Sequence, residues 1–385
     1  MALCWAEIRL MNMTLSKWML LIFGALIVVA FIVVASRPVT LVPMDQTLVE
    51  ENGMPVVTPH LPETLPILAD TMPDFTDINQ WLNTPNEQPL TKEALKGKVV
   101  MVDFWTYSCI NCVRTQPVLK GWWKAYEHDG LVIIGVHTPE FAFEKEVSNV
   151  RDAVQRAGLT YPIALDSNYG TWNAYHNNYW PAAYFFDREG RLRFTHFGEG
   201  EYDKQEQVIR ELLSEGQTLA APPTGIDTTP NFQTINTPET YFGHLRFDHF
   251  ENTDAFVRDA VANYTLISPR QNYWSLDGRW NIQGESAVNT STDASFVMSV
   301  QANAMHLVLG TTDSSKEVRI HIDGRDPTDE ELTTDTTRKD DGSVYITVDR
   351  KDLYRIARFP DAKRHTVSLT LQEPGIEFYA ATFGE

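Results

Sequence analysis

Residues 99–112, with the sequence VVMVDFWTYSCINC, decide the fold of this chain. The part before the first cysteine is almost continuously apolar and rich in β-branched and aromatic residues, which predicts a strand buried on both faces. Cys109 and Cys112 follow at once, and residues 113–130 continue with the apolar spacing of a helix that ends near Gly130. A buried strand, a CxxC pair and a helix therefore succeed one another along the chain.

The CxxC spacing at a helix start predicts two cysteines with different roles. Cys109 would lie at the helix N-terminus, where unpaired amides and the helix dipole stabilise a thiolate, the species that attacks a disulfide. Cys112 would lie one turn inside, shielded from solvent, and would resolve the mixed disulfide. Half of a zinc site is the alternative, but zinc needs four ligands, and the sequence has no second CxxC and no histidines at the partner spacing. We therefore expect a redox-active dithiol with no metal and no cofactor.

Three further residues strengthen this interpretation. Asp103 is a carboxylate inside the apolar strand, six residues before the first cysteine. We expect it to be protonated or linked to water and to exchange a proton with Cys112, although it could also be a satisfied polar residue at the strand end. Trp180 and Pro181 stand just before the apolar segment 182–186, where a proline at a tight turn is a candidate for a cis peptide bond.

The residues that follow the CxxC helix alternate between strand and helix patterns. The segments with strand character are 131–137, 161–165, 182–186 and 192–197, and those with helical character are 141–156, 169–175 and 204–213. The turn Arg188–Gly190 joins the last two strands as a hairpin. Strands that alternate with helices and end in a hairpin and a helix predict a mixed α/β sheet layered by helices.

After a linker rich in Thr, Pro, Ala and Gly, the hydrophobic period changes to two. Five segments alternate apolar with polar residues and are separated by turn residues such as Asp323–Gly324: Phe296–Val300, Met305–Leu309, Val318–Ile322, Val344–Val348 and Val367–Leu371. They predict an all-β, jelly-roll-like sandwich. Trp274, Trp280 and Tyr379 have the flat side chains that stack on sugars, but aromatic residues of strands are usually core, and we favour the core.

The N-terminal part carries a hydrophobic segment, WMLLIFGALIVVAFIVVA, at residues 18–35. As a helix it would be about 27 Å long, near the minimum for a membrane span. Arg9 and Lys17 precede it, and acids follow Arg37, so the positive-inside rule puts the N-terminus in the cytoplasm and the rest outside. A cleaved signal peptide is the alternative; we favour the anchor because the apolar run is longer than usual for a signal sequence, and both export the remainder.

Length and composition limit the other classes of function. The 385 residues exceed what one core usually fills. A formal net charge of -19 argues against nucleic acid as a partner, because phosphates would be repelled. With only three cysteines, a scaffold stapled by disulfides is excluded, and Cys4, ahead of the hydrophobic segment, is unrelated to the CxxC.

The motifs together resemble the thioredoxin superfamily, in which a buried aspartate, a CxxC, a helix proline and a cis-proline fall at these spacings. The resemblance lies in DFWTYSCINC, Pro117 and NYWPAAYFFDREGRL. More narrowly, WTYSCINC, GVHTPEFAFE, YGTWNAY and FGEGEYD resemble DipZ-like, TlpA-related thiol-disulfide oxidoreductases. In these, a β-sandwich resembling a carbohydrate-binding module follows the thioredoxin domain. The similarity covers roughly residues 72 to 385.

The resemblance implies a role for each matching residue. Cys109 would be the nucleophile, Cys112 the resolving thiol, Asp103 the buried proton carrier and Pro181 the cis-proline beside the disulfide. The backbone of Trp180 would pair with an extended substrate segment by strand addition.

Two departures from thioredoxin leave questions open. Ile110 and Asn111 replace the Gly and Pro between the cysteines, which leaves the reduction potential and the direction of electron flow undecided. Glu140, in the HTPEF motif, could tune Cys109 as an acid does in some TlpA-like relatives, or it could equally be an acid at a helix entry. The multi-span electron conduit of DipZ is missing, so a CcdA- or DsbD-like membrane donor is expected to supply electrons.

We therefore predict a membrane-anchored, extracytoplasmic thiol-disulfide oxidoreductase that exchanges dithiol for disulfide with exported proteins, most plausibly as a reductant. The predicted parts are the cytoplasmic tip and anchor 1–37, an extended linker 38–72, a thioredoxin-like α/β domain 73–217, a linker 218–240 and the β-sandwich 241–385, which would bind carbohydrate by analogy alone. The rivals are a disulfide oxidase or isomerase, a thiol peroxidase, and an envelope-binding adaptor that acts through the sandwich.

Overall fold

The computed structural model describes residues 48–51, 54–57, 65–215, 219, 236–361 and 363–384, and the chain divides into two compact units, Met1–Pro62 and Glu63–Glu385. In the first unit, β1 (Leu48–Glu51) pairs with β2 (Met54–Val57) in an antiparallel hairpin, so the predicted linker is not wholly extended. The predicted membrane span at 18–35 lies outside the described residues. Among the helices that are described, none combines the length and the apolar character that crossing a membrane requires.

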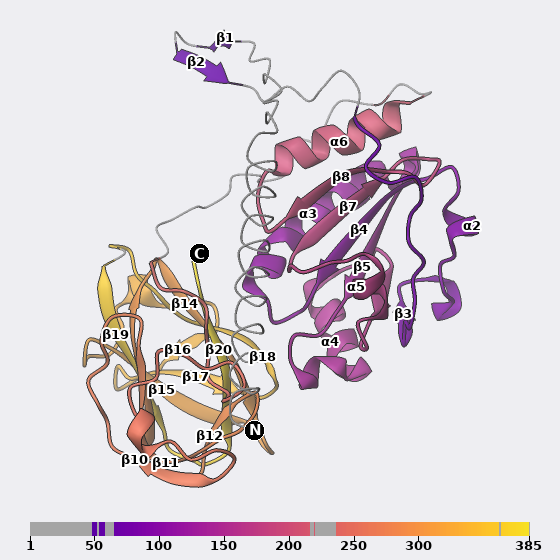
Figure 1. Ribbon diagram of the computed structural model, residues 1–385. Coiled ribbons are helices and arrows are strands. Elements are labelled where there is room, and N and C mark those ends of the chain that lie inside the picture. The colour runs from indigo at the N-terminus through magenta and orange to yellow at the C-terminus, as the bar shows by residue number, and fades with distance from the viewer. Residues whose placement is uncertain are drawn as a thin grey trace, which may run out of the picture. The chain divides into compact units, whose positions relative to one another are not determined.

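The first half of the second unit is a thioredoxin-like α/β domain built on a six-stranded mixed sheet with the order β3-β6-β5-β4-β7-β8 (Figure 1). Its strands are β3 (Gln80–Leu82), β4 (Val99–Trp105), β5 (Leu131–His137), β6 (Ile163–Leu165), β7 (Ala182–Phe186) and β8 (Leu192–Phe197). Strand β4 is parallel to β5 and antiparallel to β7, and every residue in it is buried, as its continuous apolar sequence predicts.

Helices lie on both sides of this sheet. They are α2 (Lys92–Leu95), α3 (Ile110–Tyr126), α4 (Val147–Ala157), α5 (Gly170–Ala174) and α6 (Tyr202–Ser214). The even-numbered residues of β4, such as Phe104, pack in a cluster with Trp172 of α5 and Trp81. Because side chains alternate along a strand, Asp103 projects from the opposite face.

The predicted helix 141–156 is interrupted. Residues Ala142–Lys145 form a 3-10 turn, Glu146 is extended, and α4 begins only at Val147. The cause is a local hydrogen-bond arrangement in which the side chain of Glu144 accepts from the backbone of Phe141 and Glu140. The chain therefore turns before the helix begins, and this turn carries a residue that matters for the site.

The N-terminal boundary of this domain lies earlier than the sequence indicates. Leu68 N–H donates to the carbonyl of Leu192 at 2.7 Å, and Leu192 N–H donates to the carbonyl of Ala69 at 2.9 Å, so this segment pairs with the edge of β8. Leu65 and Met72 are buried. Residues 65–72, predicted as part of a free linker, are therefore packed on the domain.

The second half is a large all-β region, here called the β domain. Its strands are β9 (Thr240–Tyr241), β10 (Val261–Tyr264), β11 (Trp274–Ile282), β12 (Ala287–Asn289), β13 (Ala294–Gln301), β14 (Ala304–Thr311), β15 (Lys316–Ile322), β16 (Thr336–Arg338), β17 (Val344–Val348), β18 (Asp352–Arg358), β19 (Arg364–Leu371) and β20 (Ile376–Phe383). The antiparallel order is β16-β17-β15-β19-β13-β11-β12-β20-β14-β18, with β10 on β11 and β9 on β20.

The alternating segments of the sequence form strands whose apolar residues are buried, as predicted. Phe296, Met298 and Val300 of β13 are fully buried, and the corresponding residues of β14, β15, β17 and β19 are buried too, all but Val344 in the same core cluster. Trp274 and Trp280 are also fully buried in it, and Tyr379 is buried. These three rings are therefore core residues, not an exposed platform on which a sugar could stack.

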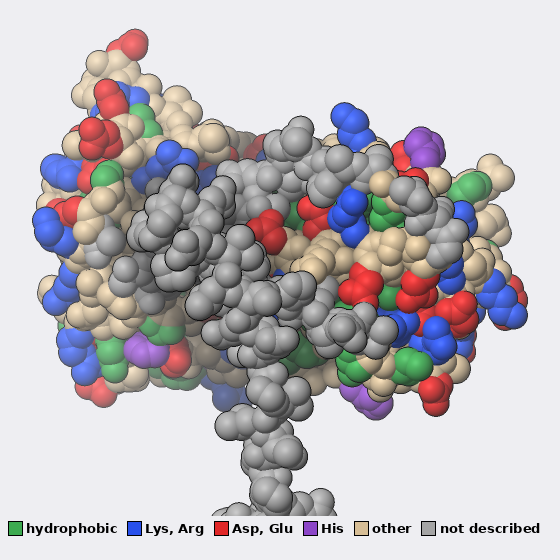
Figure 2. Space-filling model, turned by 90° about the horizontal axis from the view of Figure 1, so that it is seen from above, with side chains coloured by type: hydrophobic (Ala, Val, Ile, Leu, Met, Phe, Trp, Pro, Cys, Tyr) green, Lys and Arg blue, Asp and Glu red, His purple; other side chains and the backbone are tan. Residues whose placement is uncertain are grey.

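The surface carries charge of both signs. In the face shown in Figure 2, acidic and basic side chains are interspersed over the described residues. On this face the charge is therefore mixed and does not form a single acidic patch.

Candidate redox site at Cys109 and Cys112

The two cysteines sit where the central strand of the sheet passes into a helix. Helix α3 begins directly after Cys109, which is its N-cap residue with extended backbone angles. The Cys109 Sγ atom accepts a hydrogen bond from the backbone N–H of Cys112 at 3.3 Å. An N–H donor at a helix N-terminus favours negative charge on the atom that it contacts. The geometry therefore suits Cys109 as a thiolate.

The two thiols differ in exposure. Both are free in this structure; Cys109 is partly exposed, whereas Cys112 is only 2% exposed. Burial raises the pKa of the Cys112 thiol well above its usual value, and the hydrogen bond with Cys109 and the charge of Asp103 act in the same direction. Cys112 therefore stays protonated at neutral pH and needs a proton acceptor before it can attack.

Asp103 is placed to interact with the buried thiol. It is 3% exposed, and burial raises its pKa from 3.8 to about 8. A carboxyl group with a pKa near the working pH can both take and return a proton. The expectation that this residue is protonated at neutral pH agrees with the raised pKa, and its role as proton carrier remains a prediction.

The cis-proline loop lies at the same end of the sheet. The Trp180–Pro181 peptide bond is cis, as the sequence indicated. Pro181 precedes β7, whose first residue, Ala182, pairs with Phe104 near the end of β4. The Trp180 indole N–H donates to the carbonyl of Thr138 at 3.1 Å, which fixes the ring beside the loop after β5. The loop is therefore next to the segment that leads to Cys109, and its contact with substrate remains a prediction.

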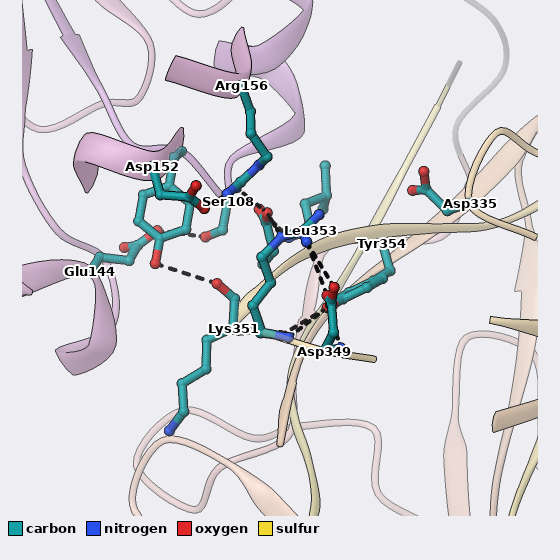
Figure 3. Close-up of polar contacts among 12 residues, drawn as sticks. Ser108, Glu144, Asp152, Arg156, Asp335, Asp349, Lys351, Leu353 and Tyr354 are labelled. Atoms are coloured by element: carbon teal, nitrogen blue, oxygen red, sulfur yellow. Dashed lines mark hydrogen bonds and ion pairs between the residues drawn. The ribbon is translucent and has the colours of Figure 1, made fainter. Parts of the chain in front are cut away.

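A buried glutamate that the sequence analysis did not single out contacts the residue before the nucleophile. Glu144 is fully buried, and the hydroxyl of Ser108, the residue before Cys109, donates to its Oε1 atom at 2.6 Å (Figure 3). Its Oε2 atom accepts from the backbone N–H of Phe141 at 3.0 Å. Burial raises the pKa of Glu144 from 4.5 to about 7, and these hydrogen bonds limit the rise. A second titrating carboxyl group is thus hydrogen-bonded to the residue directly before Cys109.

Glu140, the acid that the sequence analysis proposed for tuning, is engaged elsewhere. Its Oε1 atom accepts from the hydroxyl of Tyr241 at 2.5 Å and pairs with Arg246 Nη1 at 2.9 Å, both in the β-domain half. Glu140 thus contacts the β domain, and Glu144 contacts Ser108, the residue before the nucleophile. Any influence of Glu140 on Cys109 remains a prediction.

The β domain contacts the elements that carry the redox site. The hydroxyl of Tyr107 donates to the carbonyl of Lys351 at 3.4 Å, and Arg156 of α4 pairs with Asp352 at 2.5 Å. Arg114 of α3 donates to the carbonyl of Gly384 at 3.2 Å. Residues at the start of β18 and just after β20 therefore contact Tyr107, α3 and α4.

Comparison with known proteins agrees with this geometry. A family model described as AhpC/TSA family matches residues 68–195, and one described as Thioredoxin like C-terminal domain matches residues 237–384. Thiol-disulfide oxidoreductase YkuV of Bacillus subtilis is 30% identical over 149 residues, which cover 38% of this chain and 97% of YkuV. This chain belongs to the thiol-disulfide oxidoreductases of the thioredoxin superfamily.

A longer relative matches both halves of the chain. Protein DipZ of Mycobacterium tuberculosis is 41% identical over 252 residues, which make up 65% of this chain and 36% of DipZ. The chain thus spans about a third of the length of that relative. A solved structure, the solution structure of a thioredoxin-like protein in the oxidized form, matches 38% of this chain and 97% of its own, with 30% identity and a TM-score of 0.35. The predicted DipZ- and TlpA-like membership is confirmed.

Proposed function

We propose that this protein is a membrane-anchored, extracytoplasmic reductant of disulfides in exported proteins. The observation that carries the proposal is the pairing of a partly exposed Cys109, whose sulfur accepts the N–H of Cys112, with a buried Cys112 thiol one turn behind it. The first is suited to attack and the second to resolve.

In the proposed reaction, the Cys109 thiolate attacks one sulfur of a substrate disulfide. The substrate S–S bond breaks, and the second substrate sulfur leaves as a thiolate that takes up a proton. Cys112 then loses its proton to Asp103 in its ionised form and attacks the Cys109 sulfur, which releases the first substrate sulfur as a thiolate that takes up this proton. The substrate gains two electrons and two protons, and the pair Cys109–Cys112 becomes a disulfide.

The burial of Cys112 supports the reducing direction. Reduced dithiols whose thiolates are strongly stabilised make oxidising proteins, because the reduced form is then favoured. Here burial above all raises the pKa of Cys112, and the hydrogen bond with Cys109 and the charge of Asp103 add to the rise. A thiolate that is disfavoured in this way makes the disulfide form of the protein more favourable. We therefore expect a low reduction potential and electron transfer to substrates.

The proposed location is supported by the apolar sequence of residues 18–35 and by the charges around it. The anchor would leave the redox domain outside the cytoplasmic membrane, where a CcdA- or DsbD-like membrane protein would re-reduce the cysteine pair. The predicted jelly-roll-like sandwich would remain outside as well. A carbohydrate ligand for it would need residues other than the three buried rings.

The function is tested by the turnover of insulin disulfides and by the potential of the pair Cys109–Cys112. We expect the full-length chain to reduce insulin with a thiol donor, a Cys109→Ser variant to be inactive, and the potential to lie near the roughly -270 mV of thioredoxin. A potential near about -120 mV would instead assign an oxidase, and turnover of hydrogen peroxide faster than of insulin would assign a peroxidase. A Cys109→Ser variant that keeps full activity in cells would favour the adaptor.

The location is tested with two single-cysteine variants, one that retains Cys4 and one that retains Cys109. A membrane-impermeant maleimide added to intact cells or spheroplasts should label Cys109 and should leave Cys4 unlabelled until the membrane is permeabilised. Labelling of both residues, or of neither, before permeabilisation would contradict the proposed orientation.

A further inference from the structure

A cleft of about 570 Å³ lies beside the start of α3. Helix residues Ile110 and Arg114 line one side, and His306 of β14 and Arg358 of β18 line the other. Its volume is within the range of sites that hold peptides and small ligands. Because Ile110 directly follows Cys109, the cleft begins one residue from the nucleophile.

The cleft is basic in a chain with a formal net charge of -19. Its lining includes Arg114, Lys120, Arg156, Arg355 and Arg358, and contains neither aspartate nor glutamate. A positive cleft in a negative protein attracts anions selectively, because the rest of the surface repels them.

Part of this charge is neutralised from outside the cleft and part is not. Glu199 pairs with Arg114 at 2.8 Å, Asp352 pairs with Arg156, and Asp335 pairs with Arg355 at 3.6 Å. Within the portion of the chain that is described, neither Lys120 nor Arg358 pairs with a carboxylate; Lys120 donates to the backbone carbonyl of Ala157 in α4. These two cations are therefore open to an anionic ligand.

A buried histidine adds a second polar feature to the same cleft. His306 is 4% exposed, and its Nε2 atom lies 2.6 Å from the carbonyl of Gly384, so Nε2 carries the proton of the ring. Burial lowers the pKa of His306 to about 4, which keeps the ring neutral at pH 7. Its Nδ1 atom is then an acceptor, and it has no partner among the described residues. Such an atom favours a ligand that brings an N–H donor.

We propose that this cleft binds an acidic peptide segment next to the cysteine of the disulfide substrate. The carboxylates of the segment would lie near Lys120 and Arg358, and an amide N–H would donate to His306 Nδ1. A peptide is the occupant that the position favours, because the cleft begins one residue from Cys109, whose proposed substrates are proteins. The inference rests on the proposed function, because it names the class of substrate that Cys109 attacks.

Direct binding tests the inference without any redox step. A fluorescent peptide with three glutamates beside a serine in place of cysteine is titrated with the full-length chain, together with a peptide in which glutamines replace the glutamates. We expect the acidic peptide to bind about tenfold more tightly at low ionic strength, as two partly exposed charge pairs allow, and the difference to shrink in about 0.5 M salt.

Two variants localise the effect. Lys120→Gln with Arg358→Gln removes the open cations of the cleft, and Lys124→Gln with Arg279→Gln removes the same charge from exposed positions outside it. The first should bring the preference for the acidic peptide below about threefold, and the second should leave it at about tenfold. Equal binding of both peptides by the unmodified chain, or equal effects of the two variants, would overturn the inference.

Turnover separates the inference from the proposed function. The corresponding cysteine disulfides should both be reduced, and the acidic one should have the lower KM, with a similar kcat. Reduction of both at the same KM would refute the acidic preference and leave the reductase intact. If neither disulfide is reduced, the proposed function fails, and the binding titration still decides whether the cleft takes acidic peptides.

Discussion

Glu144 provides the sharpest quantitative prediction, because it combines complete burial with a titratable carboxyl group. It is 0% exposed, and burial raises its pKa from 4.5 to about 7. Glutamine has the same shape and cannot ionise. Its carbonyl can accept from the backbone of Phe141, and its amide can donate to the hydroxyl of Ser108, so Glu144→Gln should fold with the same local structure.

The sign and size of the effect follow from linkage. The folded-state pKa of Glu144 is raised, so the contribution of the protonated group to stability is complete below about pH 4.5 and is lost as the pH rises through about 7. A rise in pKa from 4.5 to about 7 corresponds to about 3 kcal/mol. Over this interval, the free energy of unfolding of Glu144→Gln should rise by about 3 kcal/mol relative to that of the unmodified protein.

The assay is denaturant unfolding of the full-length chain and its variants at intervals from about pH 4.5 to 8.5. Glu146→Gln makes the same chemical change at an exposed position two residues away, and it controls for the loss of one negative charge. Its stability should run parallel to that of the unmodified protein. If the Glu144→Gln curve also runs parallel, the carboxyl group does not ionise in this interval and the reasoning fails.

Three other changes have expected outcomes. Asp103→Asn should slow the attack of Cys112 on the mixed disulfide about 10²-fold and remove a pH dependence near 8, measured by rapid-mixing kinetics of peptide release; an unchanged rate would exclude Asp103 as the proton acceptor. Trp274→Ala should lower the free energy of unfolding by about 3–5 kcal/mol, because the ring is fully buried in the β domain, and a loss below about 1 kcal/mol would contradict that packing. Arg156→Gln should lower the free energy of unfolding by less than about 1 kcal/mol, because the arginine is partly exposed, and should keep the rate of insulin reduction within about twofold of that of the unmodified protein. A tenfold loss of activity would mean that the contact with the β domain orders the redox site.

Local sequence patterns were sufficient to predict the buried strands, the start of the CxxC helix and the cis-proline. Strand β4 is a continuous apolar run and is buried throughout, and the period of two in the C-terminal half matches the buried residues of β13 and β19. The cysteine at a helix start and the cis bond before Pro181 follow from short motifs with a direct geometric meaning.

What the sequence did not show depends on partners that are distant along the chain. Glu144 meets Ser108 across 36 positions, and its turn lacks the usual Ser, Thr, Asp or Asn at the N-cap, because Phe141 stands there. A glutamate three residues after Phe141 is the spacing of a capping box and could have indicated the turn. The helical pattern of residues 141–156 concealed this signal. The basic cleft likewise joins α3 to strands β14 and β18, which no local pattern connects.

The central claim is that Cys109 attacks and Cys112 resolves, and trapping of the mixed disulfide tests it most directly. Cys112→Ser and Cys109→Ser variants of the full-length chain are each mixed with a peptide disulfide and analysed by intact-mass spectrometry followed by peptide mapping. The account predicts that Cys112→Ser accumulates one adduct on Cys109 and that Cys109→Ser, whose remaining thiol is 2% exposed, accumulates almost none. A stable adduct on Cys112 in the second variant, with none on Cys109 in the first, would contradict it.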